Sequence, residues 1–143
     1  MAKVKYTRVG DVQTFEIGVP GIEKIVIDQT GVPADKRGGV AKGLLGAAAL
    51  ACYEAALAGA LEARGAKYES IEAEADLTLG ANAVGQGRVK KIDLHTTVKL
   101  DEDDSAIFDR CVKIMRPGCL VTGSLHEGIE MVYDLQADYG DDD

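Results

Sequence analysis

The sequence predicts an α+β fold in which antiparallel strands accompany one long central helix. Segments in which apolar and polar side chains alternate occur on both sides of a proline-free run rich in alanine and leucine. The chain is 143 residues long, enough to bury a core without disulfides or a structural metal. We see no internal repeat and no dividing linker, and therefore expect a single domain over residues 1–143.

The first third of the chain has the pattern of three short strands. Residues 4–9, 12–19 and 22–27 are separated by glycine-containing turns, an order typical of a β-meander. Residues 29–39 then combine glycine, proline and charged side chains. This composition fits a mobile connecting loop.

A long helix is expected from residue 40 to residue 64. The run contains no proline, and Gly65 follows it, a residue suited to the C-terminus of a helix. One stripe of the helix, at three- and four-residue steps, consists of Leu45, Ala48, Cys52, Ala55 and Gly59. Such a stripe of mostly small side chains lets another backbone approach the helix closely.

Two longer strands, a second helix and a last strand follow. Apolar and polar side chains alternate over residues 71–79 and 92–100, which predicts a long hairpin. Acidic residues and serine at 103–105 favour the start of a helix that Pro117 ends. Renewed alternation over residues 128–135 predicts the last strand.

The composition argues against several kinds of partner and site. The 16 basic and 24 acidic side chains give a formal charge of -8, which disfavours nucleic acid and anionic membranes as partners. We find no signal segment and no run of about 18 apolar residues that a membrane span needs, so we expect a cytoplasmic protein. The cysteines and histidines lack metal-ligand spacing; no metal or cofactor is expected. The acidic tail, residues 137–143, is expected to be disordered.

Any chemistry is expected to run through thiols. Cys111 lies on the apolar side of the second helix and is interpreted as a packing residue. Cys52 fits either a small apolar filler or a reactive thiol, and Cys119 stands at a helix-to-strand junction, where functional residues collect. A reactive thiol also needs a cation, a helix N-terminus or a hydrogen-bond donor that lowers its pKa. His126 is either a proton donor near Cys119 or a surface residue.

Three stretches of the chain resemble one protein family. They are GLLGAAALACY at 43–53, GCLVTGSL at 118–125 and IEMVYDL at 129–135. The first resembles the helix segment ending in a cysteine and an aromatic residue in the OsmC and Ohr proteins, the osmotically induced and organic hydroperoxide resistance family. The other two resemble the second cysteine segment and the final strand of that family. The order of elements is similar over nearly the whole chain.

The resemblance implies an intertwined homodimer whose long helices pack between two sheets and whose active sites are shared between subunits. It also implies a peroxidase, an oxidoreductase acting on organic hydroperoxides in oxidative stress defence. By matching position, Cys52 is the peroxidatic thiol that becomes a sulfenic acid, and Cys119 is the resolving thiol that forms the Cys52–Cys119 disulfide. An external dithiol reductant then opens this disulfide.

The chain departs from the family pattern where the peroxidatic thiol is activated. Lys42 replaces the glutamate that orients the family's activating arginine, and Leu120 replaces a proline after the second cysteine. Only Arg8 and Arg37 precede Cys52 among the arginines. We favour Arg37 as the activating cation, because its glycine-rich loop can fold over the thiol. Lys42 is a further candidate, although the helical residues between it and the thiol span about 15 Å.

A non-catalytic role is the alternative. Such a member of the same fold binds a small apolar or thiol ligand at the dimer interface, or uses its cysteines as a redox sensor. Thiol reactivity separates the two roles, because a peroxidase needs an accessible and acidic Cys52. A packing cysteine instead resists alkylation until the protein unfolds.

Overall fold

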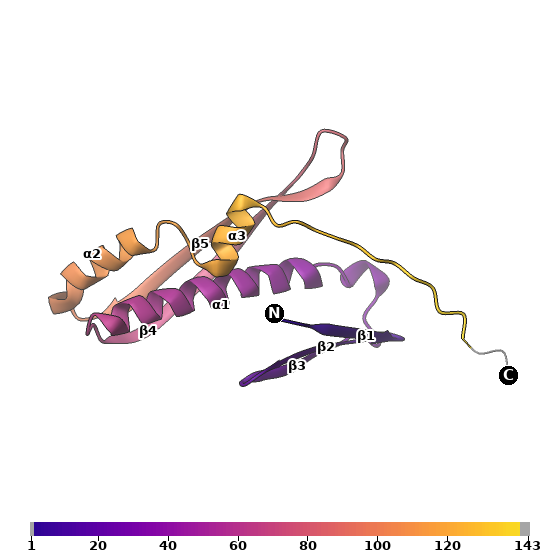
Figure 1. Ribbon diagram of the computed structural model, residues 1–143, viewed down its shortest axis with the longest axis horizontal. Helices are drawn as coiled ribbons and strands as arrows, with labels where there is room; N and C mark the ends of the chain where they lie inside the picture. The colour runs from indigo at the N-terminus through magenta and orange to yellow at the C-terminus, as the bar shows by residue number, and fades with distance from the viewer. Residues whose placement is uncertain (1, 141–143) are drawn as a thin grey trace. The chain divides into compact units, whose positions relative to one another are not determined.

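The computed structural model describes residues 2–140 and confirms the α+β class, with antiparallel sheets and a long helix (Figure 1). The chain forms two compact units, Met1–Val40 and Ala41–Asp143, which are described one at a time. The single domain expected over the whole chain stays a prediction. Of the tail expected to be disordered, residues 141–143 lie outside the described residues.

The first unit is a meander of three antiparallel strands, as the sequence predicts. In spatial order the strands are β1 Lys5–Val9, β2 Val12–Val19 and β3 Ile22–Asp28. Val9 pairs with Val12 across the first turn, where the φ of 60° at Gly10 is one that glycine adopts readily. A short 3-10 turn, η1 Ala34–Lys36, lies within the predicted loop.

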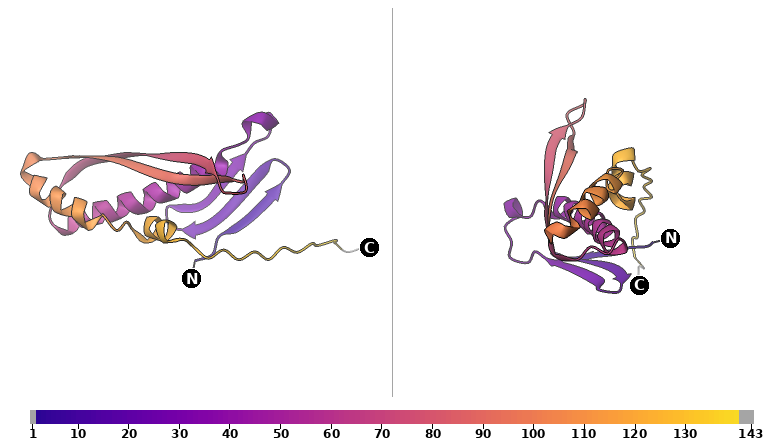
Figure 2. Two further views of the ribbon diagram at one scale, coloured as in Figure 1. Left: turned by 90° about the horizontal axis from the view of Figure 1, so that it is seen from above. Right: turned by 90° about the vertical axis from the view of Figure 1, so that its left-hand side faces the viewer.

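The second unit is built on a helix and a long hairpin. The helix is α1, Val40–Ala63, and the hairpin pairs β4, Tyr68–Ala81, with β5, Gly87–Leu100. The helix runs alongside the hairpin (Figure 2). Gly46 is buried where the helix contacts the hairpin. A Cβ added at this position would lie only 3.2 Å from the Leu77 side chain. Glycine therefore allows the helix and the sheet to approach closely here.

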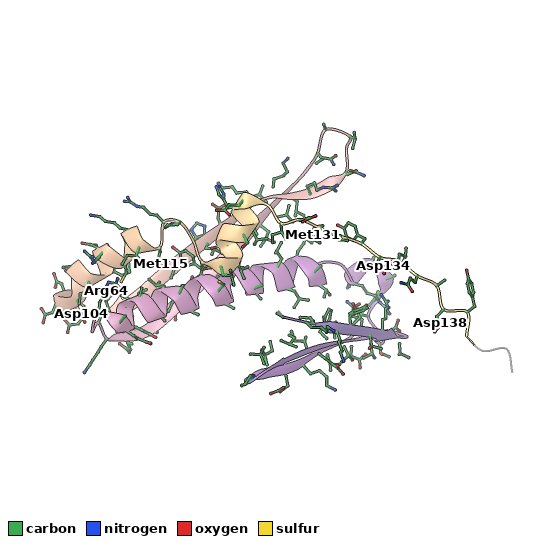
Figure 3. The ribbon with its side chains drawn as sticks, in the orientation of Figure 1. Arg64, Asp104, Met115, Met131, Asp134 and Asp138 are labelled. Atoms are coloured by element: carbon green, nitrogen blue, oxygen red, sulfur yellow. The ribbon has the colours of Figure 1, made fainter. Side chains whose placement is uncertain are left out.

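The core of the second unit lies where the end of α1 meets α2, Ser105–Ile114. A 3-10 turn, η2 Glu102–Asp104, precedes α2. The buried members are Leu57, Leu61, Ala66, Cys111 and Met115. Cys111 is completely buried, which confirms its interpretation as a packing residue. Met115 lies at the end of α2 (Figure 3).

Two expectations for the C-terminal part are wrong. Residues after Cys119 form a third helix, α3 Leu120–Glu127, so Cys119 joins two helices and does not lead into a strand. Within residues 2–140, the predicted strand over 128–135 is not formed, and the segment runs on without secondary structure (Figure 3). A strand forms only where a neighbouring strand edge is available for pairing. The apolar side chains of this unpaired segment are exposed, with Tyr133 at 82%.

One helical segment is long and apolar enough to cross a membrane, judged by length and composition alone. It spans Ala34–Ala63, contains α1 and has a mean hydropathy of 1.7, which corrects the expectation that no run is sufficiently apolar. The core helix of a soluble protein meets the same criterion. Only 22% of the apolar window is buried, so α1 presents apolar surface that the described chain leaves uncovered.

Candidate functional site

Two of the residues predicted for the site meet at the start of α3. Cys52 lies half-buried in the middle of α1, and Cys119 immediately precedes α3. The backbone N–H of Val121, in the first turn of α3, donates a hydrogen bond to the Cys52 sulfur at 3.4 Å. The fold thus brings two free thiols from distant segments to the first turn of the same helix.

Cys119 caps α3 through a reciprocal pair of hydrogen bonds with Thr122. The backbone N–H of Cys119 donates to the Thr122 hydroxyl at 2.9 Å, and the Cys119 sulfur accepts from the Thr122 backbone N–H. The Thr122 hydroxyl also lies 3.1 Å from this sulfur. Burial raises the pKa of the Cys119 thiol, but hydrogen bonds from Cys52 and Thr122 outweigh it, so the pKa lies below its usual value.

Tyr53 adds a neutral hydroxyl to the site. Burial, and then the negative charges of Glu54 and Cys119, raise the pKa of Tyr53 above its ordinary 10.0. The carboxylate of Glu54 accepts a hydrogen bond from the Thr96 hydroxyl of β5. Thr96 lies on the half-buried face of β5, and this hydrogen bond satisfies its hydroxyl there. Tyr53 stays protonated near neutral pH and is able to donate a hydrogen bond.

The second unit contains a cavity of about 810 Å³, and neither Cys52 nor Cys119 is among its lining residues. Its walls come from α1, β5, α2, α3 and the turn before α3, and include Tyr53, Gly118 and Thr122, which are sequence neighbours of the cysteines. Apolar lining residues include Leu45, Leu94, Met115 and Leu125, and cationic ones include Lys90, Lys91 and Arg116. The volume fits a small organic molecule. His126, predicted as a proton donor or a surface residue, is exposed at the cavity in the last turn of α3.

The arginines considered for thiol activation are engaged within the first unit. Arg37 donates to the Asp11 carboxylate and to the Val32 carbonyl, both at 2.7 Å. The hydrogen bond and the charge of Arg37 hold the pKa of Asp11 below its ordinary value. Arg8 donates to the Gly10 carbonyl at 3.2 Å. The catalytic role assigned to Arg37 stays a prediction.

Lys42 is too far from the thiol of its own chain to activate it. It lies exposed in the first turn of α1, and the helix continues without interruption through Cys52. The intervening residues span about 15 Å along the axis, more than a lysine side chain bridges. The donor that Cys52 does have is the Val121 backbone N–H.

Thr122 and Val121 are site residues that the sequence interpretation missed. The available signal was Thr122 standing three residues after Cys119, the spacing of a capping box. Cysteine is not among the usual N-cap residues, and the segment was expected to lead into a strand. Within residues 2–140, no group of three or more His, Cys, Asp or Glu side chains is arranged to hold a metal ion.

Comparison with known proteins agrees with the architecture. A family model described as OsmC-like protein matches residues 35–134, whereas no curated protein matches the chain. A Psychrobacter arcticus structure, described as a candidate osmotic stress induced and detoxification response protein, has a TM-score of 0.60 at 20% identity, with 87% of this chain and 88% of that chain covered. An OsmC-like protein of unknown function from Vibrio cholerae has a TM-score of 0.56 at 18% identity, with 87% and 91% covered.

Proposed function

The chain belongs to the OsmC-like protein family, and from this premise we propose that it is a thiol-dependent peroxidase that reduces organic hydroperoxides. The observation that carries the proposal is the meeting of Cys52 and Cys119 at the first turn of α3. There, both sulfurs accept hydrogen bonds from donors of this helix. Two free thiols at the same helix turn are what a peroxidase cycle through a disulfide requires.

In the proposed cycle, the Cys52 thiolate attacks one oxygen of the hydroperoxide. An S–O bond forms, the O–O bond breaks, and the leaving alkoxide takes a proton to become an alcohol. The Cys119 thiolate then attacks the sulfur of the Cys52 sulfenic acid, so that an S–S bond forms and the hydroxide leaves as water after taking a proton. An external dithiol reduces the disulfide and is itself oxidised.

Hydrogen bonds from α3 reach both sulfurs of this cycle. The Val121 N–H donates to the Cys52 sulfur. The pKa of Cys119 lies below its ordinary value, which increases the share of the resolving thiol that is ionised. Arg37 remains the proposed activating cation in the assembled protein, a role that requires it to exchange its Asp11 partner.

The cavity, whose walls include Tyr53 and Thr122 near the two cysteines in the sequence, supports an organic substrate. Its apolar walls favour a hydroperoxide with a hydrocarbon body over hydrogen peroxide, because apolar surface is then removed from water. We place the activity in the cytoplasm, where reducing dithiols restore the free thiols after each turnover. A role in detoxification and oxidative stress defence agrees with the description of the Psychrobacter arcticus structure.

We also propose a homodimer with shared active sites. The face of α1 that carries Ala48, Ala55 and Gly59 is exposed in the single chain, and its small side chains suit close packing against a second copy. The apolar residues at 129–135 are also exposed. Residues 128–135 of one copy would pair with an open edge of the three-stranded sheet of the other.

Single-turnover oxidation with one equivalent of cumene hydroperoxide tests the peroxidase. We expect the wild-type protein to lose two thiols rapidly, and Cys119→Ser to lose one and to hold a Cys52 sulfenic acid that dimedone traps. Cys52→Ser should lose the fast reaction, whereas Cys111→Ala should keep it. Wild-type oxidation no faster than that of free cysteine would contradict the proposal, as would a fast reaction in Cys52→Ser.

The cavity also favours a second candidate, a protein that binds a small apolar ligand without turning it over. Its volume of about 810 Å³ lies within the range of ligand pockets. Calorimetric titration with cumyl alcohol, which carries the substrate's hydrocarbon body but no O–O bond, addresses this role. Tight binding together with slow, scattered cysteine oxidation would favour the binding protein.

A further inference from the structure

The Thr122 hydroxyl occupies a defined place in the hydrogen bonding of Cys119. A hydroxyl has one proton to donate and two lone pairs that accept. One lone pair accepts from the Cys119 backbone N–H at 2.9 Å, and the Cys119 sulfur lies 3.1 Å from the same oxygen. Because a thiolate has no proton, the hydroxyl is the donor in this contact whenever Cys119 is ionised.

The two sulfurs therefore receive unequal support. The Cys119 sulfur accepts from the Thr122 hydroxyl and from the Thr122 backbone N–H. The Cys52 sulfur accepts from the Val121 backbone N–H at the longer distance of 3.4 Å. Hydrogen bonds to the charged form of a thiol favour that form. Negative charge is thus better supported on Cys119 than on Cys52.

Gly118 keeps the space that this arrangement needs. A Cβ at Gly118 would lie 2.7 Å from the Thr122 hydroxyl oxygen, and the φ of this residue is 81°. Any other residue at position 118 would therefore need the Thr122 side chain or the local backbone to move. The sequence Gly118-Cys119-Leu120-Val121-Thr122 therefore combines the thiol, its hydroxyl donor and the glycine that lets the donor approach.

We propose that Thr122 is a positioning residue that makes Cys119 the leaving thiolate when the Cys52–Cys119 disulfide is reduced, and so directs the reductant to the Cys52 sulfur. In a thiol–disulfide exchange, the sulfur whose thiolate is more stable leaves faster. The reductant thiolate forms a bond with the Cys52 sulfur, the S–S bond breaks, and its electron pair remains on Cys119. The second thiol of the reductant then releases Cys52 and completes the oxidised reductant.

This inference rests on the disulfide of the proposed function, so its test makes that bond without a hydroperoxide. Diamide oxidises the protein, glutathione then serves as a monothiol probe, and acid quenching followed by peptide mass spectrometry locates the mixed disulfide. We expect glutathione on Cys52 in the wild-type protein and in Thr122→Ser. In Thr122→Val, opening should be about three- to ten-fold slower, with glutathione divided between both cysteines.

Glutathione on Cys119 in the wild-type protein would overturn the proposal, as would an unchanged partition in Thr122→Val or failure of diamide to form the Cys52–Cys119 bond. A protein that passes this test but does not react with cumene hydroperoxide retains the inference and loses the peroxidase. The two failures are therefore distinguishable.

A second readout needs no disulfide. The rate of Cys119 alkylation by iodoacetamide is measured against pH in the Cys52→Ser protein, with Thr122 unchanged or replaced by serine or valine. The midpoint should rise by about one pH unit with valine and remain in place with serine, because only valine removes a donor to the thiolate. Coincident profiles for all three proteins would overturn the proposal, provided that circular dichroism shows each variant folded.

Discussion

Arg37 and Thr122 are side chains whose roles follow from their contacts and not from their residue types. The sequence favours Arg37 as the activating cation, yet its guanidinium is held by Asp11 and the Val32 carbonyl. Thr122 is not among the site residues predicted from the sequence, yet its hydroxyl contacts both the N–H and the sulfur of Cys119. The partners of single side chains depend on the folded loop and helix start, which residue types alone do not specify.

The ion pair between Arg37 and Asp11 predicts a pH-dependent effect on stability. The pKa of Asp11 lies below its ordinary 3.8 in the folded protein, so the pair stabilises fully above that value and loses its effect as the pH falls through the folded pKa. Asp11→Asn should therefore lower the melting temperature at pH 7 and change it little in strong acid.

Asp35→Asn, on the exposed turn η1, is the matched control for this comparison. It should leave the melting temperature nearly unchanged at both pH values. An Asp11→Asn effect that is equal at neutral and strongly acid pH would contradict the ion-pair explanation.

At the scale of the elements, helix α1 and the hairpin β4–β5 were predictable because their patterns arise within the chain. A long proline-free run and two alternating segments are enough to identify them. Helix α3 was missed, since it has only eight residues and two of its first three, Val121 and Thr122, are β-branched, a type common in strands.

The contact between α1 and β4 predicts the effect of a larger residue at Gly46. A valine there adds a Cβ about 3.2 Å from the Leu77 side chain and two further methyl groups, so overpacking should lower the free energy of unfolding by about 1–3 kcal/mol. Chemical denaturation measures the change.

Gly43→Val serves as the control, because a Cβ at Gly43 meets nothing within 4 Å. It places the same residue in the same helix and should have little effect on the free energy of unfolding. Equal losses in both variants would mean that the close contact with the hairpin does not decide the outcome.

At the scale of the whole molecule, the segment 128–135 shows what a single chain does not provide. Its alternation predicts a strand, but no strand forms there in the described residues, and Met131 and Val132 are exposed at 64% and 82%. The alternation of apolar and polar side chains is a property of the sequence, whereas a strand also needs the edge of another strand to form hydrogen bonds with. Under the proposed homodimer, the second copy supplies that edge.

Adjacent lysine substitutions test this strand exchange. In a paired strand, neighbouring side chains point to opposite faces, so Met131→Lys and Val132→Lys add the same charge to different faces. We expect Met131→Lys, whose side chain belongs with Ile129, Tyr133 and Leu135, to weaken the dimer about ten-fold or more, and Val132→Lys to weaken it less.

Sedimentation equilibrium over a concentration series measures the two dissociation constants against that of the wild-type protein. A monomeric wild-type protein would contradict the homodimer. Equal effects of the two lysines would contradict strand pairing in this register.

The central claim, that Cys52 and Cys119 form one redox pair, is tested most directly by a disulfide map of the wild-type protein after one equivalent of cumene hydroperoxide. We predict a Cys52–Cys119 bond in nearly all molecules within the first turnover, and Cys111 reduced because it is completely buried. Scattered pairings, bonds to Cys111 or persistently free thiols would contradict the account.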